Sequence, residues 1–135
     1  MQAKSIKGKS TAAIKTALIE SIAGGFKPTL AFVFLTELEE IDAVTKMLDA
    51  AGIAVFGAST SEKFTDQGLE PEGIVALLLD MNPANFKIVL KDFTSTTVYE
   101  SACEVGAIGK KNFAHPAFII SAADIKITAE DIIKG

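Results

Sequence analysis

The sequence of 135 residues has few of the side chains that carry most enzyme chemistry and ligand stacking. It contains no tryptophan, one tyrosine, one cysteine (Cys103) and one histidine (His115). One cysteine cannot form an intrachain disulfide, which fits a reducing compartment and predicts a cytoplasmic protein. One histidine and one cysteine fall short of a transition-metal ligand set, so we expect no metal and no cofactor. Without tryptophan, the usual stacking platform for bases and sugars is missing.

Positive charge and long apolar runs are also scarce. Thirteen Lys and Arg residues against seventeen Asp and Glu residues give a net charge of −4, which repels phosphate backbones and anionic lipid. The longest apolar run, residues 30–35, is much shorter than the roughly 20 residues of a membrane span. The first nine residues lack the apolar core of a signal peptide. We therefore expect neither nucleic acid nor a membrane as a partner.

What the sequence does contain is enough apolar material for a folded core. Hydrophobic residues make up 49% of the chain, charged residues 22%, and the mean hydropathy is +0.35. This length and composition predict one globular domain that spans residues 1–135. Helical and strand-like apolar patterns follow one another along the chain. They predict an α/β fold with a mixed, mostly parallel β-sheet packed between α-helices.

The segment from residue 30 to residue 56 carries the clearest fold signal. Residues 30–35 are apolar at every position, which is typical of a central strand covered on both sides. Thr36 and Glu39 have the spacing of a capping box, and a helical apolar pattern follows them. Residues 53–56 form the next apolar run. A strand, a helix and a strand in this order predict two parallel strands, with Val33 and Phe56 in the core.

The rest of the chain divides into shorter segments. Before the central segment, we expect an edge strand or a frayed arm at residues 3–7 and a helix that begins at Ser10 or Thr11 and ends at Gly24. After it, we expect a long loop at residues 57–73 and an antiparallel hairpin whose strands are residues 74–79 and 86–91. The last elements that we expect are a helix at residues 98–108 closed by Gly109, a strand at residues 117–121, and a final helix capped by Thr128.

The end of the sequence is rich in isoleucine. Ile125 and Ile127 precede the predicted final helix, and Ile132 and Ile133 lie within it. So many isoleucines in a short segment predict packing against material beyond residue 135 or against a second copy of the chain. We therefore expect a fragment of a longer protein, or self-association into a homo-oligomer.

Three small groups of residues suggest chemistry but have a plainer explanation. Gly8-Lys9-Ser10-Thr11 resembles the end of a phosphate-binding P-loop, yet Ala3 replaces the first glycine of that pattern, which favours a simple helix cap. Cys103 and His115 would form a nucleophilic pair only if the fold brought them together beside a carboxylate. A third group, the acidic cluster at the start of a predicted helix, favours a solvated and stabilising helix end; it comprises Glu37, Glu39, Glu40 and Asp42.

The strongest candidate for a binding site is the turn after the second predicted strand. Gly57 permits close backbone approach, and the hydroxyl side chains of Ser59, Thr60 and Ser61 follow it. Such a turn can hold a small anion, and it lies at the carboxyl end of a parallel strand beside Thr36. The alternative is an ordinary Ser/Thr turn that satisfies its own backbone.

Residues 27–80 resemble the amino-terminal domain of the FIST family. The resemblance rests on the apolar strand at residues 30–35, the following helix, and the turn Gly57-Ala58-Ser59-Thr60-Ser61-Glu62-Lys63, and it extends to the apolar strand at residues 74–79. The family turn resembles Gly-Cys-Ser-Thr-Ala-Gly-Glu, so this chain departs from it at Ala58, Glu62 and Lys63.

The FIST resemblance implies a sensory domain of a bacterial signal-transduction protein. It implies a small-molecule ligand, such as an amino acid, and no catalysis. As partners it implies a carboxy-terminal FIST domain and a signalling output protein. The alternatives are a noncatalytic interaction or scaffold module, or a small hydrolase or transferase that uses the cysteine and the histidine. The expected ligand-binding residues are Thr36, Gly57, Ser59, Thr60, Ser61 and Glu62.

Overall fold

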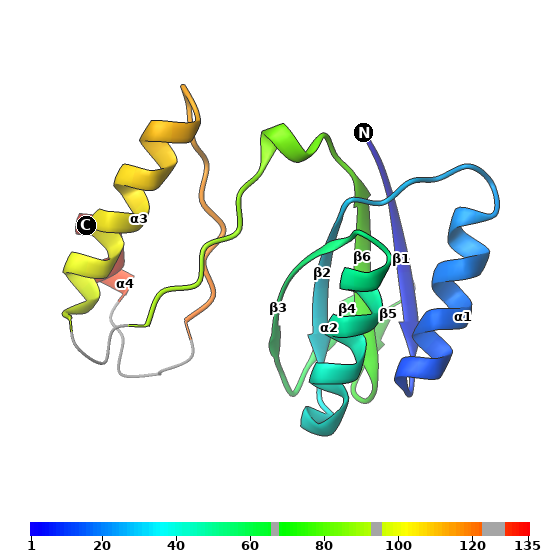
Figure 1. Cartoon of the computed structure of the whole chain (residues 1–135). Coiled ribbons are helices and arrows are strands. Elements are labelled where there is room, and N and C mark those ends of the chain that lie inside the picture. The colour runs from blue at the N-terminus through cyan, green and yellow to red at the C-terminus, as the bar shows by residue number, and fades with distance from the viewer. Residues whose placement is uncertain (66–67, 93–95, 123–128) are drawn as a thin grey trace. The chain divides into compact units, whose positions relative to one another are not determined.

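The computed structural model describes residues 1–65, 68–92, 96–122 and 129–135. The chain forms two compact units, Met1–Ile88 and Val89–Gly135, and each has its own secondary structure (Figure 1). The first unit is an α/β layer structure, and the second consists of helices and extended segments. The single domain expected for residues 1–135 stays a prediction.

A mixed four-stranded sheet forms the centre of the first unit. Its strands are β1 (Gln2–Gly8), β2 (Leu30–Leu35), β3 (Ala54–Ser59) and β6 (Ile74–Asp80), in the spatial order β1-β6-β2-β3. This confirms the α/β class, the mixed sheet, the edge strand at the N-terminus and the inner position of β2. Only β2 and β3 are parallel, whereas β6 runs antiparallel to both β1 and β2.

The expectation of a mostly parallel sheet is therefore wrong. The reason lies in the connection between β3 and β6. A parallel neighbour needs a long crossover, usually a helix, to return the chain to the same end of the sheet. Here the chain passes instead through a small hairpin, β4 (Lys63–Thr65) and β5 (Gly68–Glu70), and enters β6 from the end at which β3 finishes.

Two helices pack against the sheet. Helix α1 (Thr11–Ile22) begins as predicted, because the Ser10 side chain accepts a hydrogen bond from the Ala13 amide at 3.3 Å. Helix α2 (Ile41–Ala50) follows a short 3₁₀ turn, η1 (Leu38–Glu40), and Glu40 occupies its N-cap position. The predicted capping box of Thr36 and Glu39 is wrong, because the Thr36 hydroxyl is used elsewhere in the fold.

Both helices contribute to one core, which lies on a single face of the sheet (Figure 1). The alternation along each strand places Val33 on this face, where it is buried as predicted. The prediction that Phe56 lies in the core is wrong, because its side chain has the opposite orientation; it is half-buried and meets Phe32 edge-on with ring centroids 5.6 Å apart. The core residues are Ile6, Ile14, Leu18, Phe26, Ala31, Val33, Leu35, Val44, Leu48, Ile53, Ile74, Ala76 and Leu78.

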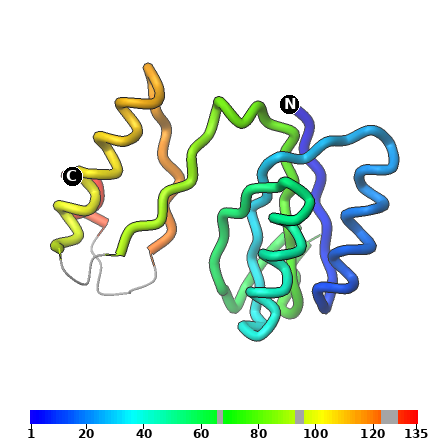
Figure 2. Tube along the Cα trace, viewed as in Figure 1, coloured from blue at the N-terminus to red at the C-terminus, as the bar shows by residue number. Residues whose placement is uncertain are grey.

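Two predictions for residues 57–91 are corrected by the structure. Strand β3 extends through Ser59, and the hairpin β4–β5 follows it, so residues 57–73 are not one long loop. After β6 the Asn82 side chain accepts a hydrogen bond from the Ala84 amide in the turn η2 (Pro83–Asn85). Residues 86–92 then form neither helix nor strand, as the extended trace in Figure 2 shows. They cannot pair with β6, because both edges of β6 already pair with β1 and β2.

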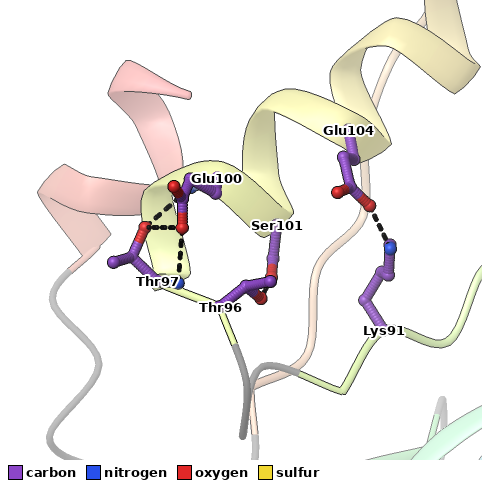
Figure 3. A network of polar contacts seen from close by, with 6 residues as sticks. All are labelled: Lys91, Thr96, Thr97, Glu100, Ser101 and Glu104. Atoms are coloured by element: carbon purple, nitrogen blue, oxygen red, sulfur yellow. Dashed lines mark hydrogen bonds and ion pairs between the residues drawn. The ribbon is translucent and has the colours of Figure 1, made fainter.

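The second unit contains α3 (Val98–Asn112) and α4 (Ala129–Lys134), which contact each other. Thr97 and Glu100 form a reciprocal capping box at the start of α3, with Lys91 ion-paired to Glu104 nearby (Figure 3). Helix α3 continues past Gly109, so the helix end predicted there is wrong.

No strand forms at residues 117–121. The Phe118 ring instead packs against α3, at the point where Gly109 leaves room for it. The part of the second unit that the structure describes also holds no strand with which these residues could pair. Thr128, Ile125 and Ile127 lie outside the described residues.

Candidate functional site

The candidate site lies at one end of the sheet in the first unit. The residues Gly8, Ile74, Leu35 and Ser59 are neighbours in register there, one from each strand. Thr36 follows β2 at this end, and the Thr60 amide donates to the Leu35 carbonyl at 2.9 Å. The structure thus brings the predicted turn and the end of β2 together, as the parallel pairing of β2 and β3 requires.

Gly57 is required for the packing of the strands. A Cβ atom at this position would overlap the carbonyl oxygen of Val33 on the neighbouring strand. The close approach inferred from the sequence is therefore real, but the partner is the backbone of β2. Gly57 contributes to a site by fixing where β3 ends.

The turn after β3 satisfies much of its own hydrogen bonding. The Thr60 hydroxyl donates to the Glu62 carbonyl at 3.0 Å and accepts from the Glu62 amide at 3.4 Å. This is the self-satisfied Ser/Thr turn that was the alternative interpretation. Ser59, Ser61 and Glu62 are exposed. Ligand binding by this turn stays a prediction, and the Thr60 hydroxyl already has both its partners within the turn.

Lys63 is the first unexpected residue at this end of the sheet. It begins β4, and only 3% of its surface is exposed. Its ammonium group donates to the Thr36 hydroxyl oxygen at 2.6 Å and to the Pro71 carbonyl at 3.3 Å. Burying an ammonium group is costly unless it is hydrogen-bonded, and these two oxygens offset part of that cost. The Thr36 side chain, although its residue is exposed, thereby becomes part of a partly buried polar cluster.

Glu37 is the second unexpected residue. Its Oε1 accepts a hydrogen bond from the Gly73 amide at 3.0 Å. This hydrogen bond is the largest cause that lowers the pKa of the Glu37 carboxyl; the backbone amides of Glu37 and Thr36 and the Lys63 ammonium lower it further, while partial burial opposes them. The carboxylate is therefore ionised at neutral pH. Its other oxygen, Oε2, is buried and has no hydrogen-bond partner among the described residues.

Gly73 joins these groups to the sheet. Its φ of 78° lies in the left-handed region, and a Cβ atom here would come within 2.6 Å of the Gly8 carbonyl oxygen. Its own carbonyl accepts from the Thr36 amide at 3.3 Å, while its amide binds Glu37. A glycine is needed at this position, and it holds the start of β6 against the residues that follow β2. We call Thr36, Glu37, Lys63 and Gly73 the edge cluster.

A second carboxylate occupies the start of α1. Glu40 accepts hydrogen bonds from the Thr11 amide at 2.9 Å and from the Thr11 hydroxyl, and these bonds lower the pKa of its carboxyl group. A phosphate bound by the P-loop-like segment would need this same amide. The amide is already bonded to Glu40, which favours the helix-cap interpretation of the Gly8-Lys9-Ser10-Thr11 sequence.

The acidic residues expected to form one solvated cluster therefore divide into two kinds. Glu37 and Glu40 are half-buried and bind parts of the chain that are distant in sequence. Glu39 and Asp42 are exposed, and Asp42 lies 4.0 Å from Lys46. Sequence spacing could not separate the two kinds, because the separation depends on where Thr11 and Gly73 lie.

A cavity of about 400 Å³ adjoins the edge cluster. This volume falls within the range of about 300–1,000 Å³ that is usual for small-molecule sites. Pro71 lines the cavity and its carbonyl also binds Lys63, so the cavity and the cluster share one segment of chain. None of the six predicted site residues lines it. The lining residues are Lys7, Gly8, Lys9, Glu70, Pro71, Glu72 and Ile74.

The second unit holds the residues of the enzymatic alternative. Cys103 lies on α3 and is half-buried, and its hydrogen bond with Tyr99 raises the pKa of the tyrosine hydroxyl. His115 is exposed, beyond the end of the helix. Within the residues that the structure describes, no hydrogen bond joins the cysteine to the histidine. Those residues also include no cluster of three or more His, Cys, Asp or Glu side chains that could hold a metal ion.

Lys63 and Glu37 are not among the site residues that the sequence predicts. A signal for Lys63 was present, since it stands where the resembled turn has glutamate. Glu37 had none, because nothing in the sequence sets it apart from the acidic residues beside it. Gly73 precedes an apolar strand, which is a common place for a turn glycine. Its position in the sequence therefore does not predict a contact with Glu37.

Comparison with protein-family models, with curated proteins and with solved structures finds no significant match to this chain. No helix within residues 1–65, 68–92, 96–122 and 129–135 is both long enough and apolar enough to cross a membrane. The resemblance of residues 27–80 to the FIST amino-terminal domain therefore rests on the residues quoted for it.

Proposed function

We propose that the first unit is a small-molecule-sensing domain of a bacterial signal-transduction protein. It binds a small, amino-acid-like metabolite beside the turn at residues 57–62. One observation carries this proposal: the buried ammonium group of Lys63, whose charge acts on the ionised Glu37 carboxylate, donates to Pro71, a residue that lines a cavity of suitable size. Buried charges of this kind cluster at functional sites more often than elsewhere in proteins.

The chemistry of Lys63 favours a ligand with a carboxylate. An ammonium group has three hydrogen-bond donors, and the structure records two acceptors for that of Lys63, on Thr36 and Pro71. A ligand carboxylate would accept the third donor in a charge-assisted hydrogen bond. Ser59 and Ser61 lie in the adjacent turn and would line the outer side of such a site.

The wider setting follows from the FIST resemblance and is part of the same proposal. A sensory domain in the cytoplasm would pass its ligand state to a carboxy-terminal FIST domain and to a signalling output protein. It would perform no catalysis. Lys63 replaces the glutamate of the resembled turn. The ligand group that contacts Lys63 would therefore be more anionic than a group that contacts glutamate at that place.

A noncatalytic scaffold module is the second candidate. The self-satisfied turn at Thr60 favours it, because a turn that closes on itself needs no ligand. The two functions differ in one respect. A scaffold function does not depend on a buried charge near a cavity. Replacing Lys63 would therefore leave the binding of partner proteins by the scaffold unchanged.

Thermal unfolding with a panel of amino acids and small carboxylic acids tests the sensing function. A ligand at a hundredfold excess over its Kd stabilises the folded state by about 2.7 kcal/mol, which is visible as a rise in Tm. We expect Lys63→Met to abolish the rise and Lys63→Arg to keep part of it. Lys46→Met, an exposed lysine on α2, is the matched control and should keep all of it. A rise that survives Lys63→Met would contradict the proposed site.

A further inference from the structure

The hairpin β4–β5 turns its apolar side outward. Phe64 and Leu69 lie directly opposite each other in it, so their side chains share one face, and 79% and 77% of their surfaces are exposed. The other face carries Lys63, which is buried, and Glu70, which is ion-paired to Lys7. A surface hairpin ordinarily has the reverse arrangement. Large apolar side chains held together in water mark interaction surfaces, and we call this pair the hairpin knob.

A second cavity lies in the first unit where β2 and β3 begin, between the C-terminal ends of α1 and α2 (Figure 1). Its volume is about 360 Å³, which is within the range of ligand pockets and gives room for an aromatic ring. Leu18, Phe26 and Ile53 line it and are buried, and Ile22 beside them is 41% exposed. We call this cavity the apolar pocket.

The charges beside the hairpin knob and the apolar pocket are opposite in sign. Glu62 precedes the hairpin, Glu72 follows it, and both are exposed. Among the described residues that line the apolar pocket, Lys27 is the charged one. The ammonium group of Lys4 lies 5.1 Å from the centre of the Phe26 ring and adds a second positive charge there. Charge complementarity of this kind brings two surfaces together in one orientation.

The knob and the pocket of one chain do not meet. Phe64 is exposed, and the full length of β3 separates the hairpin from Ile53, which lines the pocket. A contact between the knobs of two copies would bring Glu62 and Glu72 of both chains together, and like charges placed together across an interface repel. The partner that fits both surfaces is therefore a second copy of the chain that presents its pocket.

We propose that Phe64 of one copy inserts into the apolar pocket of a second copy, with Leu69 against the rim and Glu62 facing Lys27. This association goes beyond the sensing function and does not depend on Lys63 or Glu37. The two surfaces differ, so each copy in a pair keeps one free knob or one free pocket, and assembly continues head to tail. One hairpin and one pocket bury less surface than a stable complex needs, so the association is weak.

Sedimentation of the whole chain between about 10 µM and about 1 mM tests the proposal, because weak contacts form at high concentration. The average mass of the parent should rise beyond twice the monomer mass of 14.2 kDa. Phe64→Ser removes the ring, and Ala51→Glu places a carboxylate at the pocket; each should weaken association at least tenfold. Leu38→Ser, the matched control at another exposed leucine, should associate as the parent does.

An equimolar mixture of the two weakened variants tests the pairing of unlike surfaces. The Phe64→Ser chain keeps its pocket, and the Ala51→Glu chain keeps its knob. Together they should form one heterodimer of twice the monomer mass and grow no further, because the two surfaces left over are the altered ones. Lys27→Glu in the Phe64→Ser chain should weaken this heterodimer at least threefold, and Glu62→Lys in the Ala51→Glu chain should restore it.

Three results would overturn the proposal. A parent chain that stays monomeric at about 1 mM would leave the knob and the pocket without a role for each other. Dimers of Ala51→Glu alone would show a contact between two knobs. Association that is lost in Ile133→Ser and kept in Phe64→Ser would place the contact at the end of the chain. If Phe64→Ser does not fold, Leu69→Ser replaces it, since it removes the other half of the knob.

Discussion

Two polar groups lie at the same end of the sheet and differ in how completely they are satisfied. The turn after β3 is rich in hydroxyl groups, and the Thr60 side chain closes it through two hydrogen bonds to Glu62. The edge cluster has fewer polar side chains, yet it buries one ammonium group and leaves one carboxylate oxygen unpaired. The number of hydroxyl groups in a turn therefore does not predict whether the turn binds a ligand. Ligand binding depends on the donors and acceptors that have no partner within the chain.

The largest effect expected from this comparison concerns Gly57, which fixes the turn in place. Gly57→Ala would place a methyl group against the Val33 carbonyl, and β3 would have to move away from β2. Overpacking of this kind costs about 1–3 kcal/mol. Urea denaturation should show that loss.

Gly24→Ala is the matched control for Gly57→Ala. A Cβ atom at Gly24 would have no neighbour within 4 Å. Its free energy of unfolding should stay within about 0.5 kcal/mol of the parent, as is usual for a surface substitution. Equal stability of the two variants would show that the contact with β2 does not fix the end of β3. The comparison between the turn and the edge cluster would then have no structural basis.

A second prediction concerns the two half-buried carboxylates. Hydrogen bonds from Thr11 and from Gly73 lower the pKa of Glu40 and of Glu37 below the ordinary value of 4.5. A lowered pKa in the folded state means that the unfolded chain binds more protons near that pH. The stability they contribute is therefore present above about pH 4.5 and is lost as the pH falls below it.

Glu40→Gln should flatten this dependence of stability on pH. Measured by denaturation between pH 6 and pH 3, the parent should lose more stability than the variant. The exposed Glu39, changed to Gln, should follow the parent. Parallel curves for Glu40→Gln and the parent would mean that the Thr11 contact does not form in solution, and that the start of α1 is open to other anions.

The smallest effect is expected for the turn itself. Thr60→Val removes one donor and one acceptor from a partly exposed turn, which costs about 0.5–1.5 kcal/mol. It should leave the ligand-induced rise in Tm unchanged, because the Thr60 hydroxyl is already bonded within the turn. If Thr60→Val lost the ligand-induced rise in Tm and Lys63→Met kept it, the turn and not the edge cluster would be the binding group.

Much of the first unit could be predicted because its signals are local. The apolar run of β2, the Ser10 cap and the β2–α2–β3 order each depend on nearby residues. The direction of β6 could not be predicted, since it depends on the hairpin that precedes it. The absence of a strand at residues 86–92 depends on both edges of β6 being occupied, which only the assembled sheet reveals.

The candidate site was predictable in place but not in composition. The parallel pairing of β2 and β3 brings Thr36 beside the turn, as ligand sites at strand ends suggest. The departure of Lys63 from the resembled turn is visible in the sequence, but its burial is not, because the hairpin reverses the usual pattern: the lysine is buried, while Phe64 after it is 79% exposed. The role of Glu37 depends on its hydrogen bond to Gly73, thirty-six residues away in sequence.

The central claim is that the edge cluster, and not the hydroxyl turn, binds the ligand. Amide chemical shifts of the ¹⁵N-labelled chain, followed while an amino acid that raises the Tm is added, test it most directly. The Gly73 and Lys63 amides should show the largest movements, and the Ser61 amide smaller ones. Movements confined to residues 59–62, with Gly73 unmoved, would contradict the claim.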